Sequence, residues 1–217
     1  MLDRIADLHA PFVDHLVVIA SPDSRQAIEE WARSRRASVA AQVSPTGMLD
    51  AILLAMPAIA REMPDAVWIT WVDQVGVLPQ TLHRLAGAER RDPRPAMIVP
   101  TVRRADPYIH FARDAAGRVT GVLQRREGDV MPAEGEGDIG VFALTRETFD
   151  RDLRQFAGHA AGGTGTGERN FLPFIPWLAQ RQIVATMPCT DPMEAIGINT
   201  PDDLRTVEAW LQSRSDA

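Results

Sequence analysis

The chain has 217 residues, of which 45% are hydrophobic and 24% are charged, and its formal net charge is −6 at pH 7. This length and composition predict a single domain over residues 1–217 with one sizeable core. The acidic balance, without a basic face, excludes the usual pattern of a nucleic-acid-binding protein. Cys189 is the only cysteine, so an internal disulfide is excluded and a cytoplasmic location is the simplest expectation.

The N-terminal residues MLDRIADLHAPFVDH contain two aspartates and no long apolar run, unlike a secretory signal peptide. No stretch reaches the roughly 18 apolar residues of a membrane span, so we expect no membrane partner. All 23 basic residues are arginine. A mechanism that needs a lysine would have to find one outside this chain.

Strand and helix patterns alternate over the first 102 residues. Residues 1–10 read as a helix, followed by predicted strands at 14–21, 37–43, 66–72 and 96–102 and predicted helices at 21–36, 46–62 and 78–91. The continuous apolar runs of the strands are typical of parallel strands that are buried on both faces. The alternation predicts an α/β fold with a doubly wound, mostly parallel, Rossmann-like sheet.

The rhythm changes after residue 102, where we expect a small β-rich lobe. The predicted elements are a hairpin at 109–127, strands at 138–145 and 182–188, and helices at 146–158, 170–181 and 200–214. The hairpin turns around Ala116-Gly117, and the last helix has Thr200 as its N-cap and Pro201 at its first position.

Asp73 follows the most apolar predicted strand, AVWITWV. The carboxyl ends of strands in open α/β sheets are where ligands bind. A carboxylate there is a natural Mg²⁺ ligand, because Mg²⁺ prefers hard oxygens and takes few of them from protein. A loop aspartate that caps the following turn explains the position equally well.

Asn199 lies in EAIGINTPDDL, just before the last predicted helix. Its amide oxygen could be a second metal ligand, and a residue that bonds backbone N–H groups at the helix entry is the alternative. Gln42 and Gly47 lie in QVSPTGMLDAI, between a strand end and a helix start. A glutamine can pair with a base edge and a glycine lets backbone approach a flat ring, but an ordinary connecting loop has the same pattern.

The segment GGTGTG (162–167) follows a predicted helix end rather than a strand. A glycine-rich phosphate loop should follow a strand and open a helix, so we expect a flexible loop here. The five histidines show no metal-ligand spacing and no GxSxG motif is present, so neither a zinc site nor a hydrolase triad is predicted.

Taken in order, these segments resemble the nucleotidyltransferase domain of N-acetylglucosamine-1-phosphate uridyltransferases and related enzymes with a MobA-like NTP transferase domain. The resemblance covers QVSPTGMLDAI, AVWITWVDQV, GRVTGVLQRRE, DIGVFAL, GERNFLPFIPWLA and EAIGINTPDDL, which together span nearly the whole chain. Each motif is weak alone, and their conserved order makes the set specific. The resemblance implies a GT-A-like nucleotidyltransferase fold.

The implied reaction joins a nucleoside triphosphate, such as UTP, and a sugar 1-phosphate into a nucleotide sugar and pyrophosphate, with Mg²⁺ as cofactor. By resemblance, Asp73 is the catalytic metal ligand and Asn199 is the second metal ligand. Gln42 and Gly47 would bind the nucleotide base. The substrate residues of the sugar pocket would be Gln124, Asp138 and Gly140.

Four positions depart from the uridyltransferase pattern. Gln124 replaces a glutamate, Asp138 and Ile139 replace Asn and Thr, and Met48 replaces Thr. The sugar pocket is therefore expected to accept something other than N-acetylglucosamine 1-phosphate. The sequence gives neither the base, nor the sugar, nor the oligomeric state.

The first strand of the family, its "GGxGTRM" loop and its "PK" lysine have no counterpart in this sequence. That strand is central in such sheets, so its absence is expected to leave a gap in the core. A truncated or misassigned start is the explanation we favour. A non-catalytic nucleotide-sugar-binding paralogue is the alternative, and a metal-dependent glycosyltransferase is weaker, because WVDQVGV lacks the second Asp of a D-x-D pair.

Overall fold

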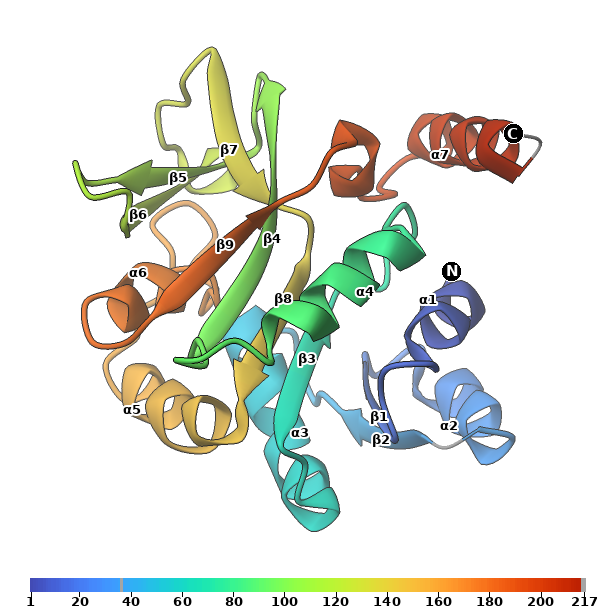
Figure 1. Cartoon of the computed structure of the whole chain (residues 1–217). Coiled ribbons are helices and arrows are strands. Elements are labelled where there is room, and N and C mark those ends of the chain that lie inside the picture. Colours follow the sequence, from blue (N-terminus) through green and yellow to red (C-terminus); the bar gives the residue numbers. More distant parts are fainter. Residues whose placement is uncertain (36, 216–217) are drawn as a thin grey trace.

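The computed structural model describes residues 1–35 and 37–215 (Figure 1). The α-helices are α1 (Leu2–His9), α2 (Arg25–Arg33), α3 (Met48–Glu62), α4 (Pro79–Ala88), α5 (Leu153–Ala157), α6 (Phe174–Ala179) and α7 (Pro201–Ser215). The strands are β1 (Leu16–Ala20), β2 (Ala37–Ala41), β3 (Ala66–Thr70), β4 (Met97–Ala105), β5 (Ile109–Arg113), β6 (Val119–Gln124), β7 (Glu134–Asp138), β8 (Val141–Thr145) and β9 (Val184–Pro188). Short 3-10 or π segments are η1 (Arg125–Glu127), η2 (Thr148–Asp152) and η3 (Pro192–Ala195). The expected strands and helices are present within a few residues of their predicted bounds.

The central sheet has five strands in the order β3-β8-β4-β7, with β9 paired to the other side of β4. The predicted α/β, Rossmann-like class is confirmed, although the sheet is more mixed than expected. Only β4 and β9 pair in parallel, whereas β8 runs antiparallel between β3 and β4. The reason is the lobe that follows β4: the chain returns from it directly through β7 and β8, without a crossover helix that would restore the parallel direction.

Strand β7, with the sequence EGEGD, was not expected from the sequence. Glycine and acidic residues are depleted in strands, so the segment carries no local strand signal. It pairs antiparallel with β4, placing Asp138 opposite Thr101. A side chain at Gly137 would put its Cβ atom 2.7 Å from Ile109 O. Glycine is therefore required where the hairpin β5–β6 crosses close to β7.

Strands β1 and β2 form a separate parallel pair, and no strand pairing joins them to the five-stranded sheet within the described residues. Instead, Phe12, from the segment between α1 and β1, stacks on Trp68 of β3, with ring centroids 5.7 Å apart. A cavity of about 580 Å³ lies beside this contact, lined by residues of β3 and α4. The two sheets therefore meet through side-chain packing and not through strand pairing.

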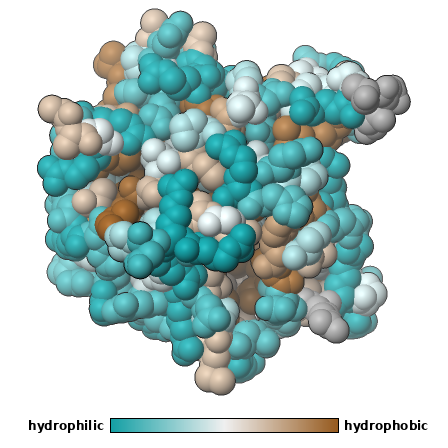
Figure 2. All heavy atoms as spheres, in the orientation of Figure 1, coloured by the Kyte–Doolittle hydropathy of each residue, from teal (hydrophilic) through white to brown (hydrophobic). Residues whose placement is uncertain are grey.

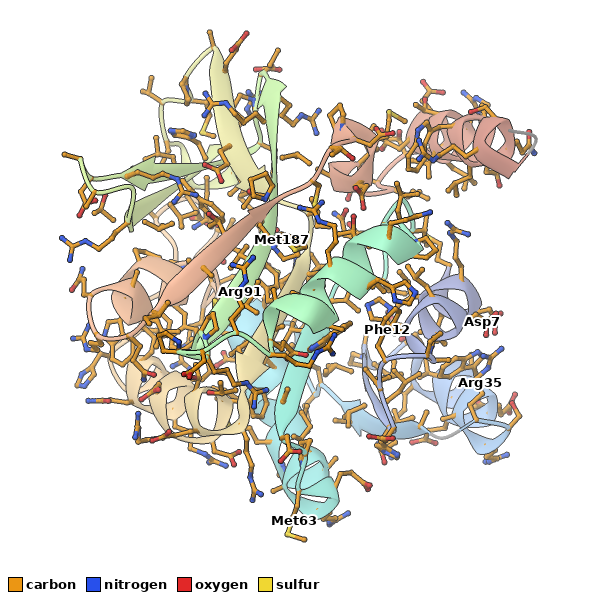
Figure 3. The ribbon with its side chains drawn as sticks, in the orientation of Figure 1. Asp7, Phe12, Arg35, Met63, Arg91 and Met187 are labelled. Carbon is orange, nitrogen blue, oxygen red and sulfur yellow. The ribbon has the colours of Figure 1, made fainter. Side chains whose placement is uncertain are left out.

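The helix α1 is attached to α2 by charged contacts at the surface. Arg35 donates hydrogen bonds of 2.8 Å to Asp3 and to Asp7, and its guanidinium lies over the Trp31 ring. Figure 3 shows Asp7 and Arg35 facing each other on this side of the molecule, with Phe12 pointing toward α4. Such exposed pairs contribute little free energy each, so apolar packing determines the fold.

The two faces of the five-stranded sheet carry separate apolar clusters. Helix α4 covers one face, where its leucines pack on Ile98, Val141 and Met187. On the other face, α3, α5 and α6 enclose a larger cluster that includes Phe142 and Phe171, whose ring centroids lie 5.1 Å apart. This second cluster includes buried side chains of both β3 and β8, the two strands whose ends meet at the candidate site.

Polar side chains cover most of the surface seen in Figure 2, with apolar atoms in a hollow near α4 and the α1–β1 connection. Within the described residues, no helix is both long enough and apolar enough to cross a membrane.

Replacing Phe142 with alanine tests the role of the aromatic cluster. Phe142 is fully buried, so its truncation should lower the free energy of unfolding by about 3–5 kcal/mol through lost apolar burial and a cavity. Urea denaturation followed by circular dichroism measures the change. The matched control is Val130→Ala, at a side chain that is 90% exposed, which should stay within about 0.5 kcal/mol of wild type. Equal effects of the two substitutions would contradict the core assignment.

Candidate functional site

Asp73 lies in the turn that follows β3, at the carboxyl end of that strand. Gln74 N donates to Trp71 O at 3.2 Å, which closes the turn. Ile198 N donates to Asp73 O at 3.1 Å, so the segment before α7 is held against this turn. A Cβ atom at Gly197 would lie 2.7 Å from Asp73 Oδ2. The structure thus brings together the two segments that were predicted to hold a metal.

Asn199 is exposed, and its Nδ2 atom donates to Gly197 O at 3.2 Å. The entry to α7 is capped by its neighbours instead: Asp203 N donates to Thr200 Oγ1 at 3.1 Å, and the Asp203 carboxylate accepts from Thr200 Oγ1 at 2.8 Å. The predicted N-cap at Thr200 is confirmed. The side-chain cap of α7 therefore comes from Thr200, and the Asn199 side chain instead donates to the segment that packs on the Asp73 turn.

Asp138 and Gly140 lie where β7 passes into β8. Trp71 N donates to Gly140 O at 3.2 Å, which joins this connection to the end of β3. Gly140 N donates to Asp138 Oδ1 at 2.8 Å, whereas the buried Oδ2 atom has no hydrogen-bond partner among the described residues. Burial raises the pKa of the Asp138 carboxyl from its ordinary 3.8 to about 6. The structure therefore presents a buried acceptor without a donor.

Gln74 belongs to this group, although sequence reasoning missed it. A Cβ atom at Gly197 would lie 2.9 Å from Gln74 Nε2, and the Gln74 Cγ atom fills the space in front of Gly140. Gln74 Oε1 is buried without a described hydrogen-bond partner. The only signal in the sequence was its position directly after Asp73. That position does not predict a site residue unless the geometry of the turn is known.

Gln124 ends β6 and is buried. Its backbone N–H donates to Asp129 Oδ2 at 2.7 Å, and its side-chain oxygen accepts from Asn170 Nδ2. Asn170 Oδ1 in turn accepts from Leu172 N at 3.1 Å. The predicted sugar-pocket residue Gln124 is thus held in place by Asn170, which follows the glycine-rich segment in the chain.

Gly47 is the buried N-cap residue of α3, with a positive φ of 120°. A Cβ atom there would lie 2.6 Å from Arg169 N. Arg169 N donates to Thr46 O at 2.9 Å and Leu49 N donates to Arg169 O at 3.1 Å. Glycine is required because the backbone around Arg169 passes directly over this position. Gln42, five residues earlier, is half-buried at the end of β2.

The predicted site residues fall into two groups that share an aromatic contact. One group surrounds the Asp73 turn, and the other joins Gly47 to Gln124 through residues 169–170. Trp71, beside Gly140, contacts Phe171 edge to face at a centroid distance of 6.2 Å. The described contacts do not connect the Gln42 side chain to either group.

The donor set around Asp73 fits a cation of low protein coordination. Burial raises the pKa of the Asp73 carboxyl, so its ionised form lacks full compensation from the protein. No cluster of three or more His, Cys, Asp or Glu side chains suited to a metal occurs in residues 1–35 and 37–215. One carboxylate and one amide match the few protein ligands that Mg²⁺ takes when substrate phosphates supply the rest.

Replacing Gly47 with alanine tests the close approach to Arg169. Positive φ alone costs a side chain about 1–2 kcal/mol, and overlap with the Arg169 backbone should add further destabilisation. Gly117→Ala is the matched control, because Gly117 also has a positive φ of 80° but has open space around it. Urea midpoints should fall further for Gly47→Ala than for Gly117→Ala, and the reverse order would contradict this packing.

Asp138→Asn tests the buried carboxyl. Because the Asp138 carboxyl ionises near pH 3.8 in the unfolded chain but only near pH 6 in the folded protein, its contribution to stability is full below about pH 4 and is lost as the pH rises from about 4 to 6. A displacement of this size corresponds to about 3 kcal/mol. Between pH 4 and about pH 7, wild type should therefore lose stability relative to Asp138→Asn by up to that amount, as measured by urea denaturation. A constant difference across this range would contradict the assignment.

Comparison with known proteins shows the family to which the chain belongs. The family profile described as MobA-like NTP transferase domain matches residues 1–137. Comparison with curated proteins gives no match. Among solved structures, a nucleoside-diphosphate-sugar pyrophosphorylase from Vibrio cholerae RC9 is similar, with a TM-score of 0.63 and 13% identity over 94% of this chain and 84% of that one.

HddC from Yersinia pseudotuberculosis, in complex with GMP-PN, is similar with a TM-score of 0.61 and 13% identity, over 96% of this chain and 83% of that one. A second crystal structure of HddC from Yersinia pseudotuberculosis has a TM-score of 0.60 and 12% identity, over 96% of this chain and 83% of that one. At such low identity these structures show a common fold. Since the family profile covers more than half of the sequence, the chain belongs to the MobA-like NTP transferase domain family.

Proposed function

We propose that the protein transfers a nucleotidyl group from a nucleoside triphosphate, such as UTP, to a sugar 1-phosphate, with Mg²⁺ as cofactor. A phosphate oxygen of the sugar phosphate bonds to the α-phosphorus, and the bond from that phosphorus to the pyrophosphate leaving group breaks. The observation that carries the proposal is the bond from Ile198 N to Asp73 O, which holds the Gly197–Asn199 segment against the carboxyl end of β3. General nucleotidyl transfer is the chemistry of the family, and the sugar phosphate and the metal are the parts that we add.

Asp73 and Asn199 are the residues that would hold the cation. When bound, Mg²⁺ supplies positive charge that offsets the negative charge of the reacting phosphates. The chain itself contributes position, because the Asp73 turn is fixed to Gly197–Asn199 on one side and to Gly140 through Trp71 on the other. Phosphoryl transfer depends on such positioning and on charge compensation more than on covalent participation by the protein.

The choice of a sugar phosphate as the second substrate rests on buried hydrogen-bonding groups. Asp138 Oδ2 and Gln74 Oε1 are acceptors without described partners, and both lie beside Gly140. The hydroxyl groups of a sugar could donate hydrogen bonds to these two oxygen atoms. A sugar phosphate is therefore a chemically suitable second substrate. The residues Gln42 and Gly47 remain the proposed base-binding segment.

Asp73→Asn tests the central residue through pyrophosphate release with Mg²⁺, several nucleoside triphosphates and a panel of sugar 1-phosphates. We expect wild type to require both substrates, and the variant to lose about 100-fold or more in kcat, because a charge that acts at the transition state is removed. Asp65→Asn is the control, since Asp65 precedes the opposite end of the same strand and is exposed.

Full metal-dependent turnover by Asp73→Asn would contradict the assignment of this carboxylate. A wild type that binds nucleotide sugars but releases no pyrophosphate with any substrate pair would favour the nucleotide-sugar-binding alternative.

A further inference from the structure

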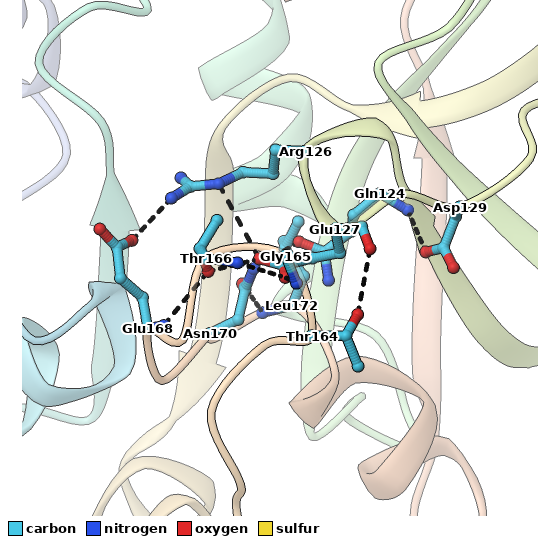
Figure 4. Close-up of polar contacts among 10 residues, drawn as sticks. All are labelled: Gln124, Arg126, Glu127, Asp129, Thr164, Gly165, Thr166, Glu168, Asn170 and Leu172. Atoms are coloured by element: carbon cyan, nitrogen blue, oxygen red, sulfur yellow. Dashed lines mark hydrogen bonds and ion pairs between the residues drawn. The ribbon is translucent and has the colours of Figure 1, made fainter.

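The glycine-rich segment 162–167 surrounds a carboxylate of the protein itself (Figure 4). Gly165 N and Thr166 N donate to Glu127 Oε2 at 2.9 and 3.2 Å, and Thr166 Oγ1 donates to Glu127 Oε1 at 2.7 Å. Thr164 Oγ1 donates to the Glu127 main-chain oxygen at 3.0 Å. We name residues 162–167 the Gly-Thr loop. The loop that we expected to be flexible is therefore attached at three consecutive residues: the Glu127 carboxylate accepts from Gly165 and Thr166, and the Glu127 main-chain oxygen accepts from Thr164.

The composition of the Gly-Thr loop is explained by this close contact. A Cβ atom at Gly163 would lie 2.5 Å from Glu127 Cδ, and one at Gly165 would lie 2.6 Å from Arg126 O. The Glu127 side chain is only 7% exposed. The hydrogen bonds from Thr166 and Gly165 lower the pKa of the Glu127 carboxyl, so the carboxylate form that they require is the one present at neutral pH.

Two further contacts join the same two segments, and both come from residues that precede Glu127 in the chain. Gln124 accepts from Asn170, and Arg126 donates to Glu168 Oε2 at 2.7 Å. Residues 124–127 and 164–170 are thus connected at successive positions along both segments. Gln124, a predicted sugar-pocket residue, lies at one end of this series.

The other side of the segment is attached to Gly47 without any help from Glu127. Arg169 exchanges main-chain hydrogen bonds with Thr46 and Leu49, and its guanidinium pairs with Asp50. Loss of the Glu127 contacts would therefore free the Gly-Thr loop and the Asn170 side, while the base-side segment keeps its own attachments.

We propose that Glu127 is a positioning residue that acts through the Gly-Thr loop to hold the Gln124–Asn170 pair in place for the sugar phosphate. Both carboxylate oxygens of Glu127 are engaged by loop donors, so the residue acts through the loop rather than by touching substrate. The inference rests on the proposed function. It adds that binding of the sugar phosphate depends on Glu127, whereas binding of the nucleoside triphosphate does not.

The test measures KM for each substrate separately in wild type and in Glu127→Ala, using whichever pair supports wild-type turnover. The variant should raise KM for the sugar 1-phosphate by about 10-fold, because a displacement of about 1 Å in a binding group is enough for such a loss. The KM for the nucleoside triphosphate should stay unchanged. Glu134→Ala, at an exposed carboxylate on β7, is the control and should leave both values unchanged.

Thr166 offers a matched pair in case Glu127→Ala fails to fold. Thr166→Ser keeps the hydroxyl that donates to Glu127, whereas Thr166→Val keeps the shape and removes it. The expected order of KM for the sugar phosphate is Thr166→Val well above Thr166→Ser, with Thr166→Ser close to wild type. Equal values for the two variants would overturn the proposal.

Hydrogen–deuterium exchange without substrates gives a readout that does not depend on activity. Residues 162–167 should exchange faster in Glu127→Ala than in wild type, while residues 46–50 keep their wild-type rates. Unchanged exchange at 162–167, or an equal rise in both KM values, would overturn the role of Glu127. Absence of turnover in wild type would instead contradict the proposed function, so the two failures are distinguishable.

Discussion

The antiparallel pairing of β8 between β3 and β4 brings Gly140 and the Asp73 turn to the same end of the sheet. Because Thr70 pairs with Val141, the residue before β8, Gly140, is delivered to the end of β3, where its carbonyl accepts from Trp71 N. The turn that contains Asp73 is then closed from the other side by the segment before α7. A parallel strand at this position would need a crossover connection and could not bring its preceding residues to the same end of the sheet.

Near the end of β3, this arrangement leaves several buried polar atoms of the described residues without hydrogen-bond partners. Thr70 Oγ1, Gln74 Oε1 and Asp138 Oδ2 are all buried without hydrogen-bond partners in the described part of the chain. Each such atom disfavours the folded state, since it loses its hydrogen bonds to water and gains none from protein. The aromatic cluster around Phe142 and Phe171 packs on the same strands and provides compensating apolar burial. The strands that carry the site are thus also the strands that the aromatic cluster stabilises.

Most of the fold could be predicted from the sequence, because apolar runs and helix signals are local. The turn with Asp73, the cap at Thr200 and the hairpin of the lobe follow from such signals. The strand β7 could not be predicted, since its glycines serve a tertiary approach of Ile109 and leave no strand pattern in EGEGD. The site role of Gln74 and the contact between Glu127 and the Gly-Thr loop were missed for a related reason. Both depend on residues that are distant in the sequence.

The separation of β1–β2 from the five-stranded sheet has a consequence for affinity. Within the described residues, side-chain packing such as Phe12 on Trp68 connects the two sheets where a strand ladder would otherwise do so. Movement of the strand pair away from the sheet would therefore break side-chain packing but no backbone ladder between the two sheets. A ligand that contacts both sheets binds only the docked arrangement. Its apparent dissociation constant then equals the intrinsic constant divided by the docked fraction, so contacts around Phe12 would tune ligand affinity without touching the ligand.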